Sequence, residues 1–393
     1  MKYKIGREIL YISETLLVVI IGLFLFTSPS KTYNIFKVYL PTEITYMVIF
    51  FLISMVFVLN IRNMQMDFVS ILLLGRCMLF TVGLFFWNNY QNALTRYLAV
   101  IISFIVYTIF YNLDVGEKKF ANFCKAIFIV LCIQTIVASI NALGVDTEIN
   151  NIKVFIRVPI GGSNYISCFL VLLLPIIITL EENSKVRKIL LIIGFLSIIA
   201  TRSVSGILCL TLYSIILFGN IKRKRVLIGG ISFIVICISS LLLIQYKRPD
   251  FFARYLNVLK KVFSGDLTTF FDAFNGRFDI YFAAIHLLKD SPILGYGVGY
   301  ANYLLGQLAH NWIIESLLQA GMINLLCVIC IWISIFRKCK NKRGLRSAVA
   351  LKLMLILVLI QGLVEPNLFA FSFDFFFWMC VGGLNHILIK EVR

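Results

Sequence analysis

The stretch AHNWIIESLLQAGMINLLCVICIWISIFRKCKNKRGLR, residues 309–346, combines three patterns in one segment. It begins with His310 and Asn311, continues as an apolar run to residue 336, and ends in the basic run RKCKNKRGLR. An apolar run of this length is typical of a membrane-spanning helix, and a basic loop beside it is typical of the cytoplasmic side. The stretch therefore predicts a helix that crosses a bilayer from a polar outer mouth to a cytoplasmic end.

The same pattern recurs along the whole chain. Its 393 residues are 60% hydrophobic and only 14% charged, and the mean hydropathy is +0.92. The apolar runs are continuous and do not alternate with a period of two, so we expect helices and not a barrel of strands. We predict an all-α polytopic membrane protein with about 12 transmembrane helices. The predicted spans are residues 9–27, 40–61, 67–87, 93–112, 120–143, 163–180, 187–201, 203–219, 225–245, 310–336, 346–364 and 370–390.

The charge distribution predicts the orientation. The net charge of +18 comes from 37 basic and 19 acidic residues, an excess that would indicate nucleic-acid binding in a soluble protein. Here the basic residues lie mostly in short loops between apolar runs, such as residues 118–119, 185–188, 221–225 and 337–346. We therefore expect no nucleic acid as a partner. All these loops fall in the cytoplasm when both termini are cytoplasmic.

One long segment, residues 246–309, lies on the predicted outer side. Its stretches FFARYLNVLKKVF and GRFDIYFAAIHLLKD place apolar residues at helical spacing with charges on the opposite face. Two amphipathic helices at the outer membrane surface are expected, followed by a Pro/Gly turn region in SPILGYGVGY. The predicted organisation is a single membrane domain, with spans one to nine in residues 1–245, the extracytoplasmic loop, and spans ten to twelve in residues 310–393.

The outer mouth of span ten carries a polar stripe. Asn311, Glu315 and Gln319 share one helical face, and His310 lies at its lip. Histidine has an ordinary pKa close to neutral pH, which suits a general base. The alternative is an interfacial histidine above polar residues that join helices within the bundle.

Arg202 lies between two short spans, beside Ser203 and Ser205. Interrupted helices expose backbone N–H groups, and a guanidinium beside hydroxyl groups suits a phosphate. The alternative is an arginine that extends to the lipid headgroups.

Further arginines lie on the same predicted side. Arg277 begins the second amphipathic helix, and Arg254 occupies a comparable place in the first. Arg157 and Asn164 flank the outer mouth of span six. Pairing of Arg277 with Asp279, or binding of these arginines to lipid headgroups, is the alternative interpretation.

Other patterns give no assignment. Arg76 and Asp374 lie within apolar runs and have no role that we can derive. GYGVG, at residues 295–299, follows no strand of a βαβ unit, so a dinucleotide site is not expected. The sequence contains no zinc-ligand spacing and no phosphate-binding loop of the nucleotide-hydrolase type, so neither a metal nor a cofactor is predicted.

Together these residues predict a reaction at the outer rim. Several arginines with few carboxylates favour a multiply charged anion such as a diphosphate, and the amphipathic helices favour an anion with a lipid tail. A diphosphate is already a good leaving group, so arginines could stabilise its charge in place of a metal. The remaining task is to remove a proton from an acceptor hydroxyl, for which His310 is the candidate base.

The segment from Gly276 to Gly321 resembles the O-antigen polymerase and O-antigen ligase superfamily. The resemblance consists of an arginine before an apolar helix (GRFDIYFAAIHLL), a Pro-x-x-Gly-x-Gly turn (SPILGYGVG) and His-Asn at the start of a helix (AHNWIIESLLQAG). Upstream, TRSVSGILCL and GGSNYISCFLVLLLP are similar to further family segments. Family members often carry a Trp after the loop arginine, where this chain has Tyr281 and Phe282.

The resemblance implies a metal-independent glycosyltransferase of the GT-C class in the bacterial cytoplasmic membrane. It would act on undecaprenyl-pyrophosphate-linked glycans at the outer face, with Arg202 and Arg277 on the diphosphate and His310 activating the acceptor. A polymerase of capsule, exopolysaccharide or O-antigen repeat units is the first interpretation, with a chain-length regulator and a flippase as further candidate partners. An O-antigen ligase and a flippase of lipid-linked oligosaccharides are the alternatives.

Overall fold

The computed structural model describes residues 2–28, 38–84, 93–143, 152–219, 260–261, 277–342, 344–365, 367–368 and 370–390. Helices occupy every predicted span except residues 225–245, which lie outside the described residues, as does most of the first predicted amphipathic helix. The helices in the predicted spans are α1 (Lys2–Phe26), α2 (Thr42–Asn60), α3 (Phe68–Gly83), α4 (Ala93–Asn112), α5 (Glu117–Leu143), α7 (Ser163–Leu180), α8 (Ser184–Ala200), α9 (Val204–Gly219), α15 (Trp312–Asn341), α16 (Arg346–Gly362) and α17 (Phe371–Lys390).

Shorter elements connect these helices. They are the 3-10 helix η2 (Ile61–Asn63) and the helices α6 (Ile152–Phe155), α13 (Arg277–Leu288) and α14 (Tyr300–Leu305). Two pairs of two-residue strands complete the described elements: β1 (Thr27–Ser28) runs parallel to β2 (Val38–Tyr39), and β3 (Arg157–Val158) runs antiparallel to β4 (Gly161–Gly162). The helix predicted in GRFDIYFAAIHLLKD is confirmed as α13.

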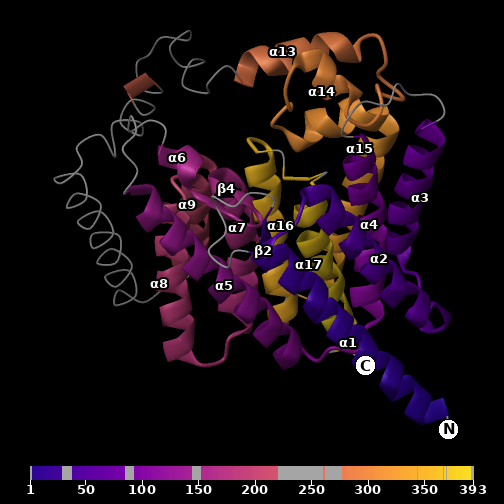
Figure 1. Ribbon diagram of the computed structural model, residues 1–393, viewed down its shortest axis with the longest axis vertical. Coiled ribbons are helices and arrows are strands. Elements are labelled where there is room, and N and C mark those ends of the chain that lie inside the picture. The colour runs from indigo at the N-terminus through magenta and orange to yellow at the C-terminus, as the bar shows by residue number, and fades with distance from the viewer. Residues whose placement is uncertain are drawn as a thin grey trace.

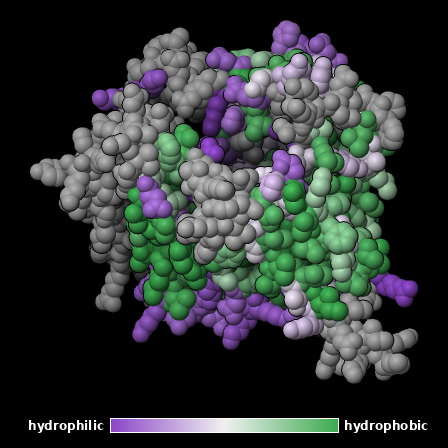
Figure 2. Space-filling view, viewed as in Figure 1, coloured by the Kyte–Doolittle hydropathy of each residue, from purple (hydrophilic) through white to green (hydrophobic). Residues whose placement is uncertain are grey.

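The helices form an upright bundle whose outer surface is apolar. α7 and α17 are almost entirely buried, with α7 packed along α16 and α17 along α4. Within the described ranges, α2, α4, α5, α7, α15 and α17 are long and apolar enough to cross a membrane. Figure 2 shows a broad hydrophobic band between two more hydrophilic ends. The chain is therefore an all-α membrane protein, and the count of twelve spans stays a prediction.

The loops predicted to be cytoplasmic lie at one end of the bundle. Both termini lie at one end, and α13 and α14 lie at the other (Figure 1). The loops predicted to be cytoplasmic are joined near the termini by ion pairs of Lys119 with Glu14, Lys125 with Glu181, Lys338 with Asp67, Arg346 with Glu117 and Glu182, and Lys390 with Asp114. The gathering of these loops at one end supports the predicted topology. Which end faces the cytoplasm stays a prediction.

α15 is broken by the loop that precedes it in the chain. Ala320 and Gly321 have non-helical backbone angles inside the span predicted at residues 310–336, and the helix then continues to Asn341. The Pro-x-x-Gly-x-Gly turn inserts at the break. Its hydrogen bonds run from Tyr296 N–H to Leu318 C=O (2.7 Å), from Gly297 N–H to Gln319 C=O (3.0 Å) and from Met322 N–H to Pro292 C=O (3.0 Å).

Two glycines allow this close approach. Gly321 has φ +65°, and a Cβ there would lie 2.0 Å from the carbonyl oxygen of Ile293. Gly295 has φ +68°, and its Cβ would lie 2.7 Å from the Gly321 nitrogen. Only glycine adopts such backbone angles without cost, and only a residue without Cβ fits the contact. The turn therefore fixes the segment from α13 to α14 against α15.

We predict that Gly321→Ala destabilises the fold by at least about 2 kcal/mol, because the added Cβ meets backbone atoms at a left-handed position. The detergent-solubilised protein should unfold several degrees lower in a thermal melt. Gly75→Ala in α3 is the matched control, since a Cβ at Gly75 meets nothing within 4 Å. Equal melting temperatures for the two variants would contradict the close packing of the turn on α15.

Candidate active site

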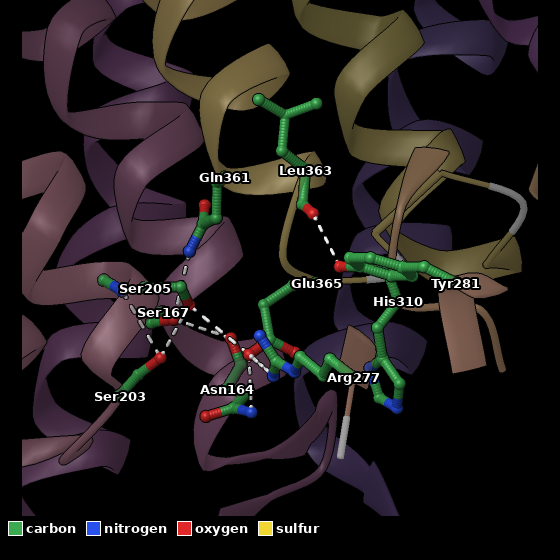
Figure 3. Close-up of polar contacts among 11 residues, drawn as sticks. Asn164, Ser167, Ser203, Ser205, Arg277, Tyr281, His310, Gln361, Leu363 and Glu365 are labelled. Atoms are coloured by element: carbon green, nitrogen blue, oxygen red, sulfur yellow. Dashed lines mark hydrogen bonds and ion pairs between the residues drawn. The ribbon is translucent and has the colours of Figure 1, made fainter. Parts of the chain in front are cut away.

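A buried carboxylate gathers polar side chains at the end of the bundle that carries α13. Glu365, in the turn after α16, accepts at Oε1 from Asn164 Nδ2 (2.7 Å), Arg277 Nη2 (3.1 Å) and the Ser205 hydroxyl (3.5 Å). The Glu365 side chain is 8% exposed and that of Arg277 is 22% exposed. A buried carboxylate is stable only with such partners, because burial removes its water. Figure 3 shows these side chains converging on Glu365 from separate segments.

Four helices begin around this cluster. Asn164 lies in the first turn of α7 and Ser205 in the first turn of α9, and Arg277 is the first residue of α13. α15 begins at Trp312, two residues after His310. Helix N-termini carry unpaired N–H groups and a partial positive charge. Their convergence adds to the charge of Arg277 and favours an anion at this place.

The backbone is unusual at two predicted catalytic residues. Within the described ranges, Arg202 (φ 57°) and His310 (φ 52°) are the non-glycine residues with positive φ. Such conformations are uncommon for residues with side chains, and they often occur at functional sites. Arg202 is buried in the bend between α8 and α9, directly before Ser203. The Ser203 hydroxyl lies 3.0 Å from that of Ser205, so this bend joins the Glu365 cluster.

His310 lies in the turn before α15, next to Arg277 in Figure 3. Tyr281 Oη donates to the His310 carbonyl (3.4 Å). Burial lowers the pKa of His310, and the charge of Arg277 lowers it further, against the opposing effect of Glu365 and Glu315. At neutral pH the imidazole is therefore mainly uncharged, which is the form a general base needs.

Two buried polar atoms near the cluster have no hydrogen-bond partner among the described residues. They are His310 Nδ1 and Asn164 Oδ1. Buried polar atoms are nearly always paired, so unpaired ones call for an explanation such as a bound molecule. Asn164 donates to Glu365 through Nδ2 and His310 lies next to Arg277 in Figure 3, so both atoms belong to the surroundings of the Glu365 cluster.

The remaining predicted residues have other surroundings. Asn311 caps α15, because its Oδ1 accepts from the backbone N–H groups of Ile313 and Ile314 (2.9 and 3.3 Å). Glu315 is buried and pairs with Arg96. Arg157 lies in β3, and its Nε donates to the Val154 carbonyl (3.0 Å). Arg254 lies outside the described residues.

Arg76 is also accounted for by contacts within the bundle. Its Nε donates to Asn324 Oδ1 (2.9 Å), and Asn324 Nδ2 donates to the Ser316 carbonyl across the break in α15 (3.1 Å). Arg76 and Asp374 line one small cavity of about 10 Å³ beneath the break. These contacts give Arg76 a role in supporting the broken helix.

The sequence interpretation missed two residues, Glu365 and Arg96. Glu365 is followed by Pro366 in a short loop between two apolar runs, and Arg96 lies near the start of an apolar run. A charged residue at the edge of a span is a candidate for function, and this signal could have identified both. Their partners are far away in the sequence, so no local spacing reveals the pairing.

Comparison with known protein families gives one match. Residues 189–329 match the family described as O-antigen ligase. No curated protein matches the chain. The matched range contains Arg202, Arg277 and His310, whereas Asn164 and Glu365 lie outside it.

We predict that Arg277→Gln raises the pKa of His310. Removing the guanidinium removes a repulsion on the imidazolium and leaves Glu365 to favour the charged form. Histidine-selective NMR titration of the purified protein measures this, with His286 and His386 as the other signals. Lys119→Gln, at the opposite end of the bundle, is the control and should leave the pKa of His310 unchanged. If the pKa of His310 is unchanged or lower in Arg277→Gln, the charge of Arg277 does not act on His310.

Proposed function

We propose that this member of the O-antigen polymerase and ligase superfamily is a polymerase of lipid-linked polysaccharide repeat units. In this proposal it transfers the growing glycan from a polyprenyl diphosphate to a new lipid-linked repeat at the outer face of the cytoplasmic membrane. The observation that carries the proposal is the placement of Arg277 between the buried Glu365 cluster and His310, whose pKa is lowered by burial and by Arg277.

The cationic groups suit a diphosphate. The contact with Glu365 uses Nη2 of Arg277. A guanidinium has five N–H donors, so Arg277 can hold Glu365 and phosphate oxygens at the same time. Arg202 and the converging helix N-termini would add positive charge on the far side of the leaving group. The proposal therefore assigns the leaving diphosphate to the space beside Arg277.

An apolar surface beside the site suits a lipid tail. α13, α14 and the turn between them expose large hydrophobic side chains: Phe282, Ile285, Ile293, Leu294, Tyr303 and Leu304. Exposed apolar surface of this kind often marks contact with a membrane or a lipid. Figure 2 shows a hollow bordered by hydrophilic residues near this end, above the hydrophobic band. A substrate with a charged head and an apolar tail would meet both surfaces.

The proposed step is a single displacement at the anomeric carbon of the donor glycan. The acceptor hydroxyl oxygen forms the new C–O bond, and the bond from the anomeric carbon to the diphosphate oxygen breaks with its electron pair. The hydroxyl proton passes to the His310 imidazole, which later returns it to water. Arg277 and Arg202 would stabilise the charge that develops on the diphosphate.

The alternative within the family is a ligase, which moves a finished glycan to a different acceptor with the same donor and the same chemistry. Polymerase and ligase differ only in the acceptor, so supplying one acceptor at a time to the purified protein distinguishes them. A flippase is the alternative from another class, and it would move the lipid-linked glycan without forming a bond.

We predict that purified protein supplied only with a lipid-diphosphate repeat unit and a chelator forms polymer, seen as a ladder on a gel. His310→Ala should abolish the ladder, because no base removes the acceptor proton. His286→Ala, which replaces an exposed histidine of α13, should leave the ladder intact. Product that forms only after addition of a lipid A core would identify a ligase. A wild-type ladder from His310→Ala would exclude His310 as the base.

We also predict that Arg277→Lys loses chain formation although it keeps a positive charge at this position. A lysine ammonium supplies a point charge and cannot bridge Glu365 and a phosphate as a planar fork does. The rate of repeat addition should fall by about 100-fold or more, with protein level and thermal stability close to those of the wild type. Full activity in Arg277→Lys would show that charge alone is sufficient.

A further inference from the structure

A second ion pair lies close to the turn that contains His310. Arg96 of α4 and Glu315 of α15 are joined by Nη1 and Oε1 at 2.7 Å. The Glu315 side chain is 2% exposed and that of Arg96 is 17% exposed. Gln319 Nε2 also donates to Oε1 of Glu315 (2.9 Å). A cation and hydrogen bonds of this kind compensate a deeply buried carboxylate for the loss of its water.

The second oxygen of this carboxylate reaches the histidine turn. Glu315 Oε2 accepts from the backbone N–H of Ala309 at 3.3 Å, and Ala309 is fully buried directly before His310. On the other side of His310, the Asn311 side chain caps α15. The strained backbone of His310 is therefore held between two side chains of the same helix.

Arg96 keeps this arrangement in place from another helix. Without it, Glu315 would lose the cation that its Oε1 contacts inside the bundle, and burial would favour movement of the side chain toward water. Such a movement would weaken the contact with Ala309. Because α4 also packs against α3, which contacts α15 below the break, Arg96 ties the turn to the rigid bundle.

We propose that Arg96 and Glu315 form a positioning pair that holds His310 in its reactive orientation. Glu315 acts through the backbone of Ala309, and Arg96 acts through Glu315. The consequence for catalysis depends on the proposed function, whereas the effect on His310 itself does not. The charged groups that act on His310 are Arg277 of α13, Glu365 after α16 and Glu315 of α15.

The first measurement is a histidine-selective NMR titration of the full-length protein in detergent, without substrate. Glu315→Gln keeps the shape of the side chain but removes the negative charge, so the pKa of His310 should fall further. Arg96→Gln should change the chemical shift of the His310 ring, and Arg96→Lys should restore it in part. Lys338→Gln, which breaks an ion pair of α15 at the opposite end, is the matched control and should leave His310 unchanged.

The second measurement is the rate of repeat addition by the same variants. Arg96→Gln and Glu315→Gln should lower kcat by about 10- to 100-fold with little change in KM, since the base is displaced and the substrate contacts remain. Arg96→Lys should recover part of kcat. An unchanged His310 signal in both glutamine variants would overturn the positioning pair whatever the activity. A changed signal together with full activity in His310→Ala would instead overturn the role of His310 in the proposed function.

Discussion

The backbone break in α15 is the constraint on which the half of the structure that carries α13 and α14 depends. A helix that stops hydrogen bonding inside an apolar bundle leaves carbonyl groups that water cannot reach. Here the turn around Gly295 and the side chain of Asn324 supply the missing donors. The turn can do this only by lying against Gly321, so the segment from α13 to α14 is fixed to the bundle. This places Arg277 beside the N-termini of α7 and α9.

The same break separates α15 into two parts with different tasks. The part beyond Gly321 is an apolar helix with basic residues at its end, as in an ordinary membrane span. The short part before it carries Asn311 and Glu315, whose side chains hold the turn around His310. A short helix fixed at both ends can present its first residues more rigidly than the free end of a long one. Rigid placement of a base is what proton transfer requires.

The sequence predicted most of the helices and the polar residues at one end, because apolar runs and basic loops are local signals. It placed Arg202, Asn164, Arg277 and His310 on the outer side, and the structure brings the segments of all four to one cluster. The partners could not be predicted, since Glu365 is 88 residues from Arg277 and Arg96 is 219 residues from Glu315. The break in α15 at Ala320 and Gly321 escaped prediction, because residues 310–336 form one continuous apolar run in the sequence. A glycine inside an unbroken helix looks the same in sequence as a glycine at a break.

The charge balance of the site explains why two glutamates accompany the arginines. The charge of Arg277 close to the imidazole lowers its basicity. Glu365 beside Arg277, and Glu315 beside Arg96, act on His310 in the opposite direction. When a diphosphate binds to Arg277, its negative charge would favour the imidazolium. The base would then become stronger at the moment when the acceptor proton has to be removed, so binding of the donor and activation of the acceptor would be coupled through a single arginine.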